Sequence, residues 1–480
     1  MQELLERPVE RSRASSSDGA DAMSIEERLS LADQRARRHA FDVESLRLHG
    51  LQAWLAGIAG NPPPWVFAVL RSVLPALRLP GWRYIGKFPV PKLERWVLLT
   101  RDEDVREVLG RADVFRVPWG QDVRVLNDGS APGTPFILGL DTGDPEEAAL
   151  YWAGLKQVMQ AFRRDDVERM VRPLAEDYAT EIVEGAGSDP FDAIQTLFVP
   201  LFIDTCERYF GVPVPPRIRV EFFQWTVAVS GLLFGPPYER DRAWATAEAG
   251  ADRVAQFVDL AIGEAIEQAR DPLAERRDDL VLHRLARQHV GDPESMSWPT
   301  MRAIMVGMIM GSVPTNALAA GHILEVLLSR PEAMEAARAA AHGGDDVQLS
   351  RCLFEAMRFR PLNPGPWRRC EKAYVVARGT ARETTIRPGT VVLASTQSAM
   401  LDPRSVDRPG RFDGTRDPAV SLLFGHGLHW CAGKAIADAQ ITQGFKALLR
   451  REGHLMRAPG AAGRMRLLGL FPEHLSVQIR

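Results

Sequence analysis

The sequence predicts one large, mainly α-helical domain with small β-sheets, and three observations support this fold class. Apolar residues recur every three or four positions in long segments of the 480-residue chain, which is the spacing of a helix with one buried face. Segments rich in β-branched residues are few and short. No stretch rich in glycine, proline and serine divides the chain after residue 80.

Helices and strands can be assigned from these patterns in chain order. The segments with helical spacing include Asp104–Phe115, Ala149–Phe162, Ala245–Arg270 and Glu332–Ala341. The strand-like segments are Arg95–Thr100, Lys372–Ala377 and Gly389–Ser395. We therefore expect residues 81–480 to form a single domain, and residues 1–80 to form an extension that is partly disordered and then helical.

The beginning of the chain does not resemble a targeting signal. Residues 1–23 are polar, charged and rich in serine, and they contain no apolar core of the kind that signal peptides have. The apolar segment Trp65–Leu77 is shorter than the roughly 20 residues that a membrane-spanning helix needs. It also contains Arg71 and Pro75. We expect a buried helix here, a cytoplasmic protein, and contact with a membrane that is peripheral at most.

The composition excludes several classes of protein. A hydrophobic share of 45% and a charged share of 25% are typical of soluble globular proteins. The net charge of -3 provides no positive field for binding nucleic acid. The four cysteines are too few and too scattered for a disulfide framework, so we expect reduced thiols, any one of which could carry chemistry.

One such thiol lies in the segment FGHGLHWCAG, Phe424 to Gly433. Cys431 stands where a glycine-rich loop leads into a helix, and the N–H groups and dipole of a helix N-terminus favour a thiolate. Gly425 and Gly427 allow a tight turn with positive φ, and Gly433 lets a flat ligand approach the helix closely. His429 can donate a hydrogen bond to an anionic group, and Phe424 can shield the sulfur from water.

This segment resembles the haem-ligand signature of the cytochrome P-450 superfamily, Phe-Gly-x-Gly-x-His/Arg-x-Cys-x-Gly, at every fixed position. The family's second hallmark, Glu-x-x-Arg, is present as Glu355 and Arg358, which share one helix face. In the family a further arginine completes this ion cluster, and Arg416 is the candidate here. The resemblance implies a triangular, mainly α-helical prism around one haem b, whose iron Cys431 would bind.

The resemblance also suggests partners for the haem propionates. In the family a histidine or tryptophan lies four residues before an arginine, and both reach a propionate. Trp152 and Lys156 are the nearest match, with lysine in place of arginine. Arg368 or Arg369, shortly after the Glu-x-x-Arg helix, would supply another contact.

The sequence departs from the family in MGSVPTNA, Met310 to Ala317. Most members carry Ala/Gly-Gly-x-Asp/Glu-Thr over the distal face of the haem, where the acid and the alcohol deliver protons. With Gly311 aligned to the motif glycine, Val313 stands at the acid and Pro314 at the threonine, and Thr315 follows. A proline inside a helix costs about 3 kcal/mol and frees the carbonyl group four residues back, which here belongs to Met310.

This departure leaves three functions open. In the first, the protein is a monooxygenase that uses dioxygen with an altered proton relay through Ser312, Thr315, water or the substrate. Its electrons would come from a separate ferredoxin or flavodoxin and a reductase, because the 49 residues after Cys431 leave no room for a fused redox domain. In the second, it uses peroxide or rearranges a hydroperoxide. In the third, it is a haem-thiolate sensor or binding protein without catalysis.

The substrate and the redox partner can be assigned only to a chemical class. By family position, the pocket walls are expected to include five residues: Trp119, Phe136, Leu138, Val313 and Trp367. Such apolar walls favour a lipophilic small molecule. The candidates for the face that docks the redox partner are Lys156, Arg163, Arg164 and Lys434.

Overall fold

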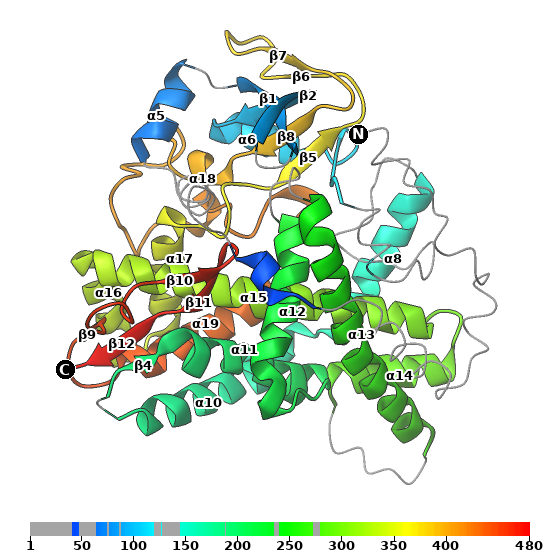
Figure 1. Ribbon diagram of the computed structural model, residues 1–480, viewed down its shortest axis with the longest axis vertical. Coiled ribbons are helices and arrows are strands. Elements are labelled where there is room, and N and C mark those ends of the chain that lie inside the picture. Colours follow the sequence, from blue (N-terminus) through cyan, green and yellow to red (C-terminus); the bar gives the residue numbers. More distant parts are fainter. Residues whose placement is uncertain are drawn as a thin grey trace.

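The computed structural model describes residues 41–47, 64–73, 76–85, 88–119, 126, 145–187, 189–234, 240–271 and 279–480. Within these residues the protein is mainly helical, with four small sheets. Figure 1 shows the long helix α15 crossing the middle of the molecule, with helices around it, the largest sheet at one end and the C-terminal strands at one side. The observed architecture agrees with the fold class expected from the sequence.

The α-helices are α5 (Pro64–Val73), α6 (Asp102–Gly110), α8 (Pro145–Ala161), α9 (Arg164–Asp166), α10 (Arg172–Gly185), α11 (Val199–Thr205), α12 (Arg219–Phe234), α13 (Arg240–Arg270), α14 (Val281–Gly291), α15 (Trp298–Ser329), α16 (Pro331–Gly343), α17 (Asp346–Phe359), α18 (Thr396–Ala399) and α19 (Lys434–Leu449). The short 3-10 or π-helical turns are η1 (Val43–Leu46), η2 (Val167–Val171), η3 (Ala193–Phe198), η4 (Cys206–Phe210), η5 (Pro216–Ile218), η7 (Pro418–Val420) and η8 (Gly427–His429).

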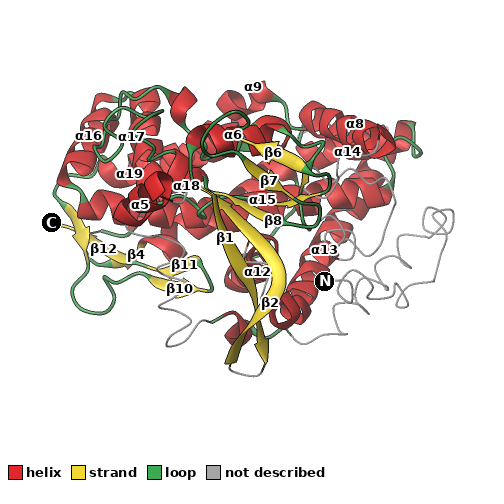
Figure 2. Cartoon of the chain, turned by 90° about the horizontal axis from the view of Figure 1, so that it is seen from above, coloured by secondary structure: helices red, strands yellow, loops and turns green. Residues whose placement is uncertain are grey.

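The largest sheet has five strands in the order β1-β2-β8-β5-β3, where β2 runs parallel to β8 and the other pairs are antiparallel. Its strands are β1 (Ala76–Ile85), β2 (Phe88–Leu99), β3 (Phe115–Arg116), β5 (Trp367–Cys370) and β8 (Val391–Ala394). The smaller sheets are formed by β4 (Phe191–Asp192), β9 (Leu455–Arg457) and β12 (Ser476–Ile479), by β6 (Tyr374–Val376) and β7 (Thr384–Ile386), and by β10 (Arg466–Leu468) and β11 (Phe471–His474). In Figure 2 the long β1–β2 hairpin extends away from the helical body.

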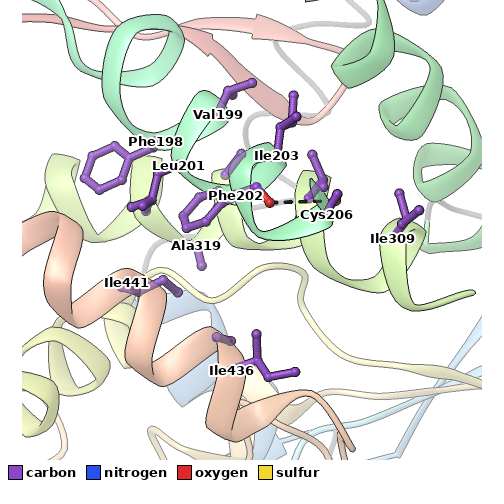
Figure 3. Packing of buried hydrophobic residues seen from close by; sticks show 14 of the residues in the cluster. Phe198, Val199, Leu201, Phe202, Ile203, Cys206, Ile309, Ala319, Ile436 and Ile441 are labelled. Carbon is purple, nitrogen blue, oxygen red and sulfur yellow. Dashed lines mark hydrogen bonds between the residues drawn. The ribbon is translucent and has the colours of Figure 1, made fainter. Parts of the chain in front are cut away.

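The core is built around α15. Figure 3 shows side chains of α11, α15 and α19 meeting there, with Phe202, Ala319 and Ile441 among them. All three of these residues are fully or almost fully buried. By length and hydropathy α15 could span a membrane, but 83% of its most apolar window is buried inside the protein. Its apolar composition is therefore that of a core helix.

One boundary expected from the periodicity is wrong. The segment Asp104–Phe115 was expected to be a continuous helix, but α6 ends at Gly110. After a short turn Phe115 enters β3, where it pairs with Cys370 of β5. The side chain of Phe115 is completely buried between the sheet and α6, so the same apolar residue serves a strand as well as it would serve a helix.

Parts of the N-terminal extension pack on the body of the protein. Strand β1 crosses the domain boundary expected at residue 81, and Arg71 of α5 donates hydrogen bonds to the carbonyl group and the hydroxyl of Ser398, at 2.8 and 3.0 Å. Farther upstream, both Nη atoms of Arg47 lie 2.9 Å from carboxylate oxygens of Glu473 in β11. The region expected to be disordered lies mostly in residues 1–40, outside the described residues.

A buried histidine links α15 to the segment after α17. His322 is 6% exposed, and its Nδ1 lies 3.0 Å from the carbonyl oxygen of Pro361. Burial, together with the neighbouring charge of Arg360, lowers the pKa of His322 to about 3. The imidazole is therefore neutral in the folded protein across the physiological pH range, whereas it titrates near pH 6.5 in the unfolded chain.

We expect this difference to make the folded protein less stable in mild acid. Below pH 6.5 the unfolded chain binds a proton at His322 that the folded protein does not bind, so this residue lowers the free energy of unfolding by about 1.4 kcal/mol per pH unit. Urea unfolding at pH 7.5, 6.5 and 5.5 gives the free energy of unfolding at each pH, and from these values its slope against pH. The variant His322→Asn should show a smaller slope than wild type, while His342→Asn, at an exposed position, should not. If the free energy of unfolding falls equally steeply with falling pH in His322→Asn and in wild type, this assignment is contradicted.

Candidate functional site

The loop before α19 forms a tight, glycine-dependent turn that ends at Cys431. The N–H group of Cys431 donates to the carbonyl oxygen of Phe424 at 2.9 Å, which closes the loop. Gly425 and Gly427 have φ values of 81° and 71°, as the sequence predicted. A Cβ atom at Gly427 would lie only 2.7 Å from the carbonyl oxygen of Leu109, so a side chain does not fit there. The loop is thus shaped by its own sequence and by its contact with α6.

Cys431 is the accessible cysteine of the protein. All four cysteines lie in described segments; the other three are fully buried, and Cys431 is partly accessible. The pKa of the Cys431 thiol is raised, because burial outweighs the opposing effect of the N–H groups of Gly433 and Lys434 and of the charge of Lys434. The donors at the start of α19 therefore favour a thiolate, and a cation facing the sulfur would favour it further.

Three other residues of this loop and the first residue of α19 have defined environments. Phe424 is half-buried and packs edge-on against Phe354, with ring centres 5.3 Å apart, and the ammonium group of Lys434 lies 5.4 Å from the Phe424 ring centre. His429 is half-buried in η8. At Gly433 a Cβ atom would lie 3.9 Å from the sulfur of Cys431, an ordinary contact, so glycine is not required there by the protein's own atoms.

The middle of α15 has one accessible face. Met308, Gly311 and Thr315 are partly or fully accessible, although most residues around them in this helix are buried. A Cβ atom built at Gly311 would meet no atom within 4 Å. Residues three and four apart share a face of a helix, so these three positions form one accessible face of α15 among the described residues.

The proline in α15 is accommodated without a break in the helix. Pro314 cannot donate to the carbonyl group of Met310, and the hydroxyl of Ser230 in α12 donates to it instead, at 2.9 Å. The hydroxyl of Thr315 donates to the carbonyl group of Gly311, and it lies 3.3 Å from the carbonyl oxygen of Ser312. The hydroxyl oxygen of Ser312 is buried and has no hydrogen-bond partner among the described residues.

Three of the five residues expected to line the substrate pocket are buried in this structure. Val313 is completely buried because it lies on the side of α15 away from the open face. Trp119 and Trp367 are also buried, at 4% and 9% exposure. Their rings pack edge-on against Phe234 and Trp96, respectively, and their role in lining a pocket stays a prediction. The remaining two pocket residues, Phe136 and Leu138, lie outside the described residues.

The ion cluster expected from the Glu-x-x-Arg hallmark is present. Arg358 pairs with Glu355 through two hydrogen bonds of 2.8 and 2.9 Å, and both side chains are buried. Arg416 joins them, with its Nε 3.2 Å from Glu355. Arg358 also donates to the carbonyl groups of Met400 and Pro409, at 3.0 and 2.8 Å. The cluster therefore ties α17 to the segment that leads into the Cys431 loop.

The residues expected to bind the propionates differ in their burial and contacts. Arg368 is buried in β5 and donates to the carbonyl group of Trp367 at 2.8 Å. Arg369 points to the other face of the strand and forms an ion pair of 2.5 Å with Glu371, so of the two alternatives it is the less suitable. Trp152 and Lys156 lie on α8 and are exposed, Trp152 by 56%.

Sequence reasoning missed two polar contacts of α15. Ser230 could have been sought, because a helix proline requires another donor for the freed carbonyl group. The second is a buried chain in which Asn316 donates to Gln440 at 2.8 Å and Gln440 donates to Thr205 at 2.6 Å. It links α15, α19 and α11, and no spacing in the sequence signals it.

These features fit a flat, apolar iron-containing group. A partly accessible thiol near hydrogen-bond donors at the start of a helix is suited to bind iron. Because Gly311 has no side chain, a flat group can lie against α15 at this position. The buried guanidinium group of Arg368 suits a carboxylate. The chemistry expected from the sequence is therefore compatible with the residues that the structure presents.

Comparisons with known proteins agree with this interpretation. Residues 237–452 match the family model for cytochrome P-450. The chain is 28% identical over 366 residues to the mycinamicin IV hydroxylase/epoxidase of Micromonospora griseorubida, covering 75% of this chain and 82% of the relative. It is 27% identical over 348 residues to the 6-deoxyerythronolide B hydroxylase of Saccharopolyspora erythraea, covering 72% and 78%.

Solved structures show the same fold. CYP105P1 in complex with filipin I has a TM-score of 0.66 at 22% identity, covering 87% of this chain and 96% of that one. Cytochrome P-450 CYP109Q5 from Chondromyces apiculatus has a TM-score of 0.64 at 21% identity, covering 88% and 96%. Fold, family model and relatives thus agree that the chain belongs to the cytochrome P-450 superfamily, as an oxidoreductase of the monooxygenase type whose cofactor is haem b.

Proposed function

We propose that the protein binds haem through the thiolate of Cys431 and uses dioxygen to oxidise a lipophilic secondary metabolite, with Thr315 as the alcohol of its proton relay. The observation that carries this proposal is the accessible Cys431 at the start of α19, in a loop whose glycines have the required φ angles. When bound, haem with a thiolate ligand supplies the activation of oxygen for insertion into a substrate.

The proximal residues would hold the cofactor. The N–H groups of Gly433 and Lys434 stabilise the negative charge on Cys431, and Phe424 restricts the access of water to it. His429 and Arg368 are the proposed donors to the propionates, with Trp152 and Lys156 as further candidates on α8. The Glu355–Arg358–Arg416 cluster holds the approach to the loop in place and does not touch the reacting atoms.

The distal residues support dioxygen as the oxidant. Thr315 lies on the open face of α15 beside Gly311, and its hydroxyl can pass a proton from water to a bound reactant while it accepts another hydrogen bond. Neither Val313 nor Pro314 can carry a proton, so water or the substrate would have to take the place of the usual carboxylate. Ser312, with its buried hydroxyl, is a second candidate for the relay.

Two comparisons support the choice of substrate class. The relatives named above act on mycinamicin IV and 6-deoxyerythronolide B by their printed names, and the structure of CYP105P1 contains filipin I. The second candidate function, turnover with peroxide, is favoured by Val313, which stands at the position where most family members carry a carboxylate. From the substrates named above, the proposed substrate is a lipophilic secondary metabolite.

The ligand prediction can be checked by spectroscopy. We expect Cys431→Ser to lose the red-shifted Soret band that the reduced carbon monoxide complex of a thiolate-ligated haem gives, because serine does not provide a thiolate. Cys352→Ser, a matched substitution at a buried cysteine, should keep the band. A Cys431→Ser protein with the wild-type band would exclude Cys431 as the ligand.

The relay prediction is tested by the amount of product formed per electron consumed. The substrate is a lipophilic compound that a spectroscopic screen shows to displace water from the haem. Thr315→Ala should lower the product formed per electron and raise the release of hydrogen peroxide. If proton transfer is lost completely, the rate of product formation should fall by about 100-fold. Thr315→Ser, which keeps the hydroxyl, is the control. Two results together would favour the peroxide function. Wild type would form no product from dioxygen, and Thr315→Ala would form product from peroxide alone at the wild-type rate.

The partner prediction concerns exposed basic residues near the proximal side. Arg163 already pairs with Asp279 at 2.9 Å, which leaves Lys156, Arg164 and Lys434; of these, Lys434 lies 3.6 Å from Asp438. Arg164→Glu and Lys434→Glu should slow reduction by a ferredoxin or flavodoxin, and more so at low salt. Arg378→Glu makes the same charge change in the β6–β7 hairpin and should have no effect. Equal slowing by all three would indicate only a response to net charge.

A further inference from the structure

The carbonyl group of Met310 needs a donor that α15 itself cannot supply. Pro314 has no N–H group, and its ring also prevents normal packing against this carbonyl group. Met310 is 4% exposed, so bulk water does not reach it freely. The hydroxyl of Ser230 donates to it at 2.9 Å, from a position 80 residues earlier in the chain.

Ser230 stands out among its neighbours on α12. The residues around it are apolar and buried, including Val227, Val229 and Leu233, and Ser230 itself is completely buried. The other buried hydroxyl of this helix, on Thr226, donates within α12 to the carbonyl group of Phe223 at 2.7 Å. Of these two hydroxyl groups, only that of Ser230 reaches the neighbouring helix.

The Met310 carbonyl group is mechanically connected to the open face of α15. It shares a peptide plane with the N–H group of Gly311, so a rotation of this plane changes φ at Gly311. The carbonyl group of Gly311 in turn accepts the hydroxyl proton of Thr315. The position of Ser230 therefore affects the direction of the Thr315 hydroxyl through two consecutive peptide groups.

We propose that Ser230 is a positioning residue, whose hydroxyl replaces the N–H group that Pro314 lacks and thereby fixes the Thr315 hydroxyl at the open face of α15. Because Ser230 belongs to α12, a displacement of α12 against α15 stretches this hydrogen bond. The orientation of Thr315 then depends on where α12 lies. The consequence for Thr315 rests on the proposed function, whereas the replacement of the proline's missing donor does not.

A double-mutant cycle in the haem-loaded protein tests the replacement. Ser230→Ala should raise the unfolding equilibrium constant in urea by about fivefold or more, because it leaves a buried carbonyl group without a donor. In the Pro314→Ala background the new N–H group serves Met310, so the same substitution should change the constant by no more than about twofold. Equal effects in the two backgrounds would overturn the proposal.

An infrared spectrum tests the effect on Thr315, with carbon monoxide as the probe. Ser230→Ala should shift or broaden the C–O stretch of the reduced complex, and Ser230→Thr or the added Pro314→Ala should restore it. Thr226→Val removes a buried hydroxyl of the same helix and should leave the stretch unchanged. An unshifted stretch in Ser230→Ala would overturn the link to Thr315. Absence of the thiolate Soret band in wild type would instead overturn the proposed function and leave the urea result standing.

Discussion

A proline in the middle of a buried helix persists only where the carbonyl group four residues back finds another donor. In this protein the donor is Ser230, and α15 is helical from Trp298 to Ser329 with Pro314 inside it. The core depends on that continuity, since α11, α12, α13, α17 and α19 all pack on this helix. Gly311 and Thr315 lie on an accessible face of the same helix, and among the described residues no atom lies within 4 Å of a Cβ built at Gly311.

The proximal side follows a different physical logic. The Glu355–Arg358 pair is buried, and a buried ion pair of this kind contributes little net stability, because the desolvation of two charges offsets their attraction. Its value lies in geometry. Arg358 holds two backbone carbonyl groups of the segment that follows α18, and Arg416 adds a contact from farther along that segment. An irregular stretch without regular backbone pairing thereby gains a fixed path to Cys431.

Motifs confined to a few neighbouring residues could be predicted from the sequence. The turn at Gly425 and Gly427 and the pairing of Glu355 with Arg358 depend on local backbone geometry, and both are present in the structure. The burial of Val313 was missed because periodicity places a residue on a helix face without saying what covers that face. Phe115 was assigned to a helix because a single apolar residue fits either period. Ser230 and Glu473 act across long sequence separations, which no local pattern encodes.

The contact between Arg47 and Glu473 has a consequence for how the chain is made. These residues are 426 positions apart. At a synthesis rate of about 5–20 residues per second, roughly 20 to 85 seconds pass between the addition of Arg47 to the growing chain and the addition of its partner. During this interval the guanidinium group of Arg47 has no carboxylate of Glu473 to bind, while Ser45 can already meet Thr246, which lies 201 positions away, at 2.6 Å in the finished fold. The contact of Arg47 therefore cannot form before Glu473 has been added, whereas the contact of Ser45 becomes possible once Thr246 is present.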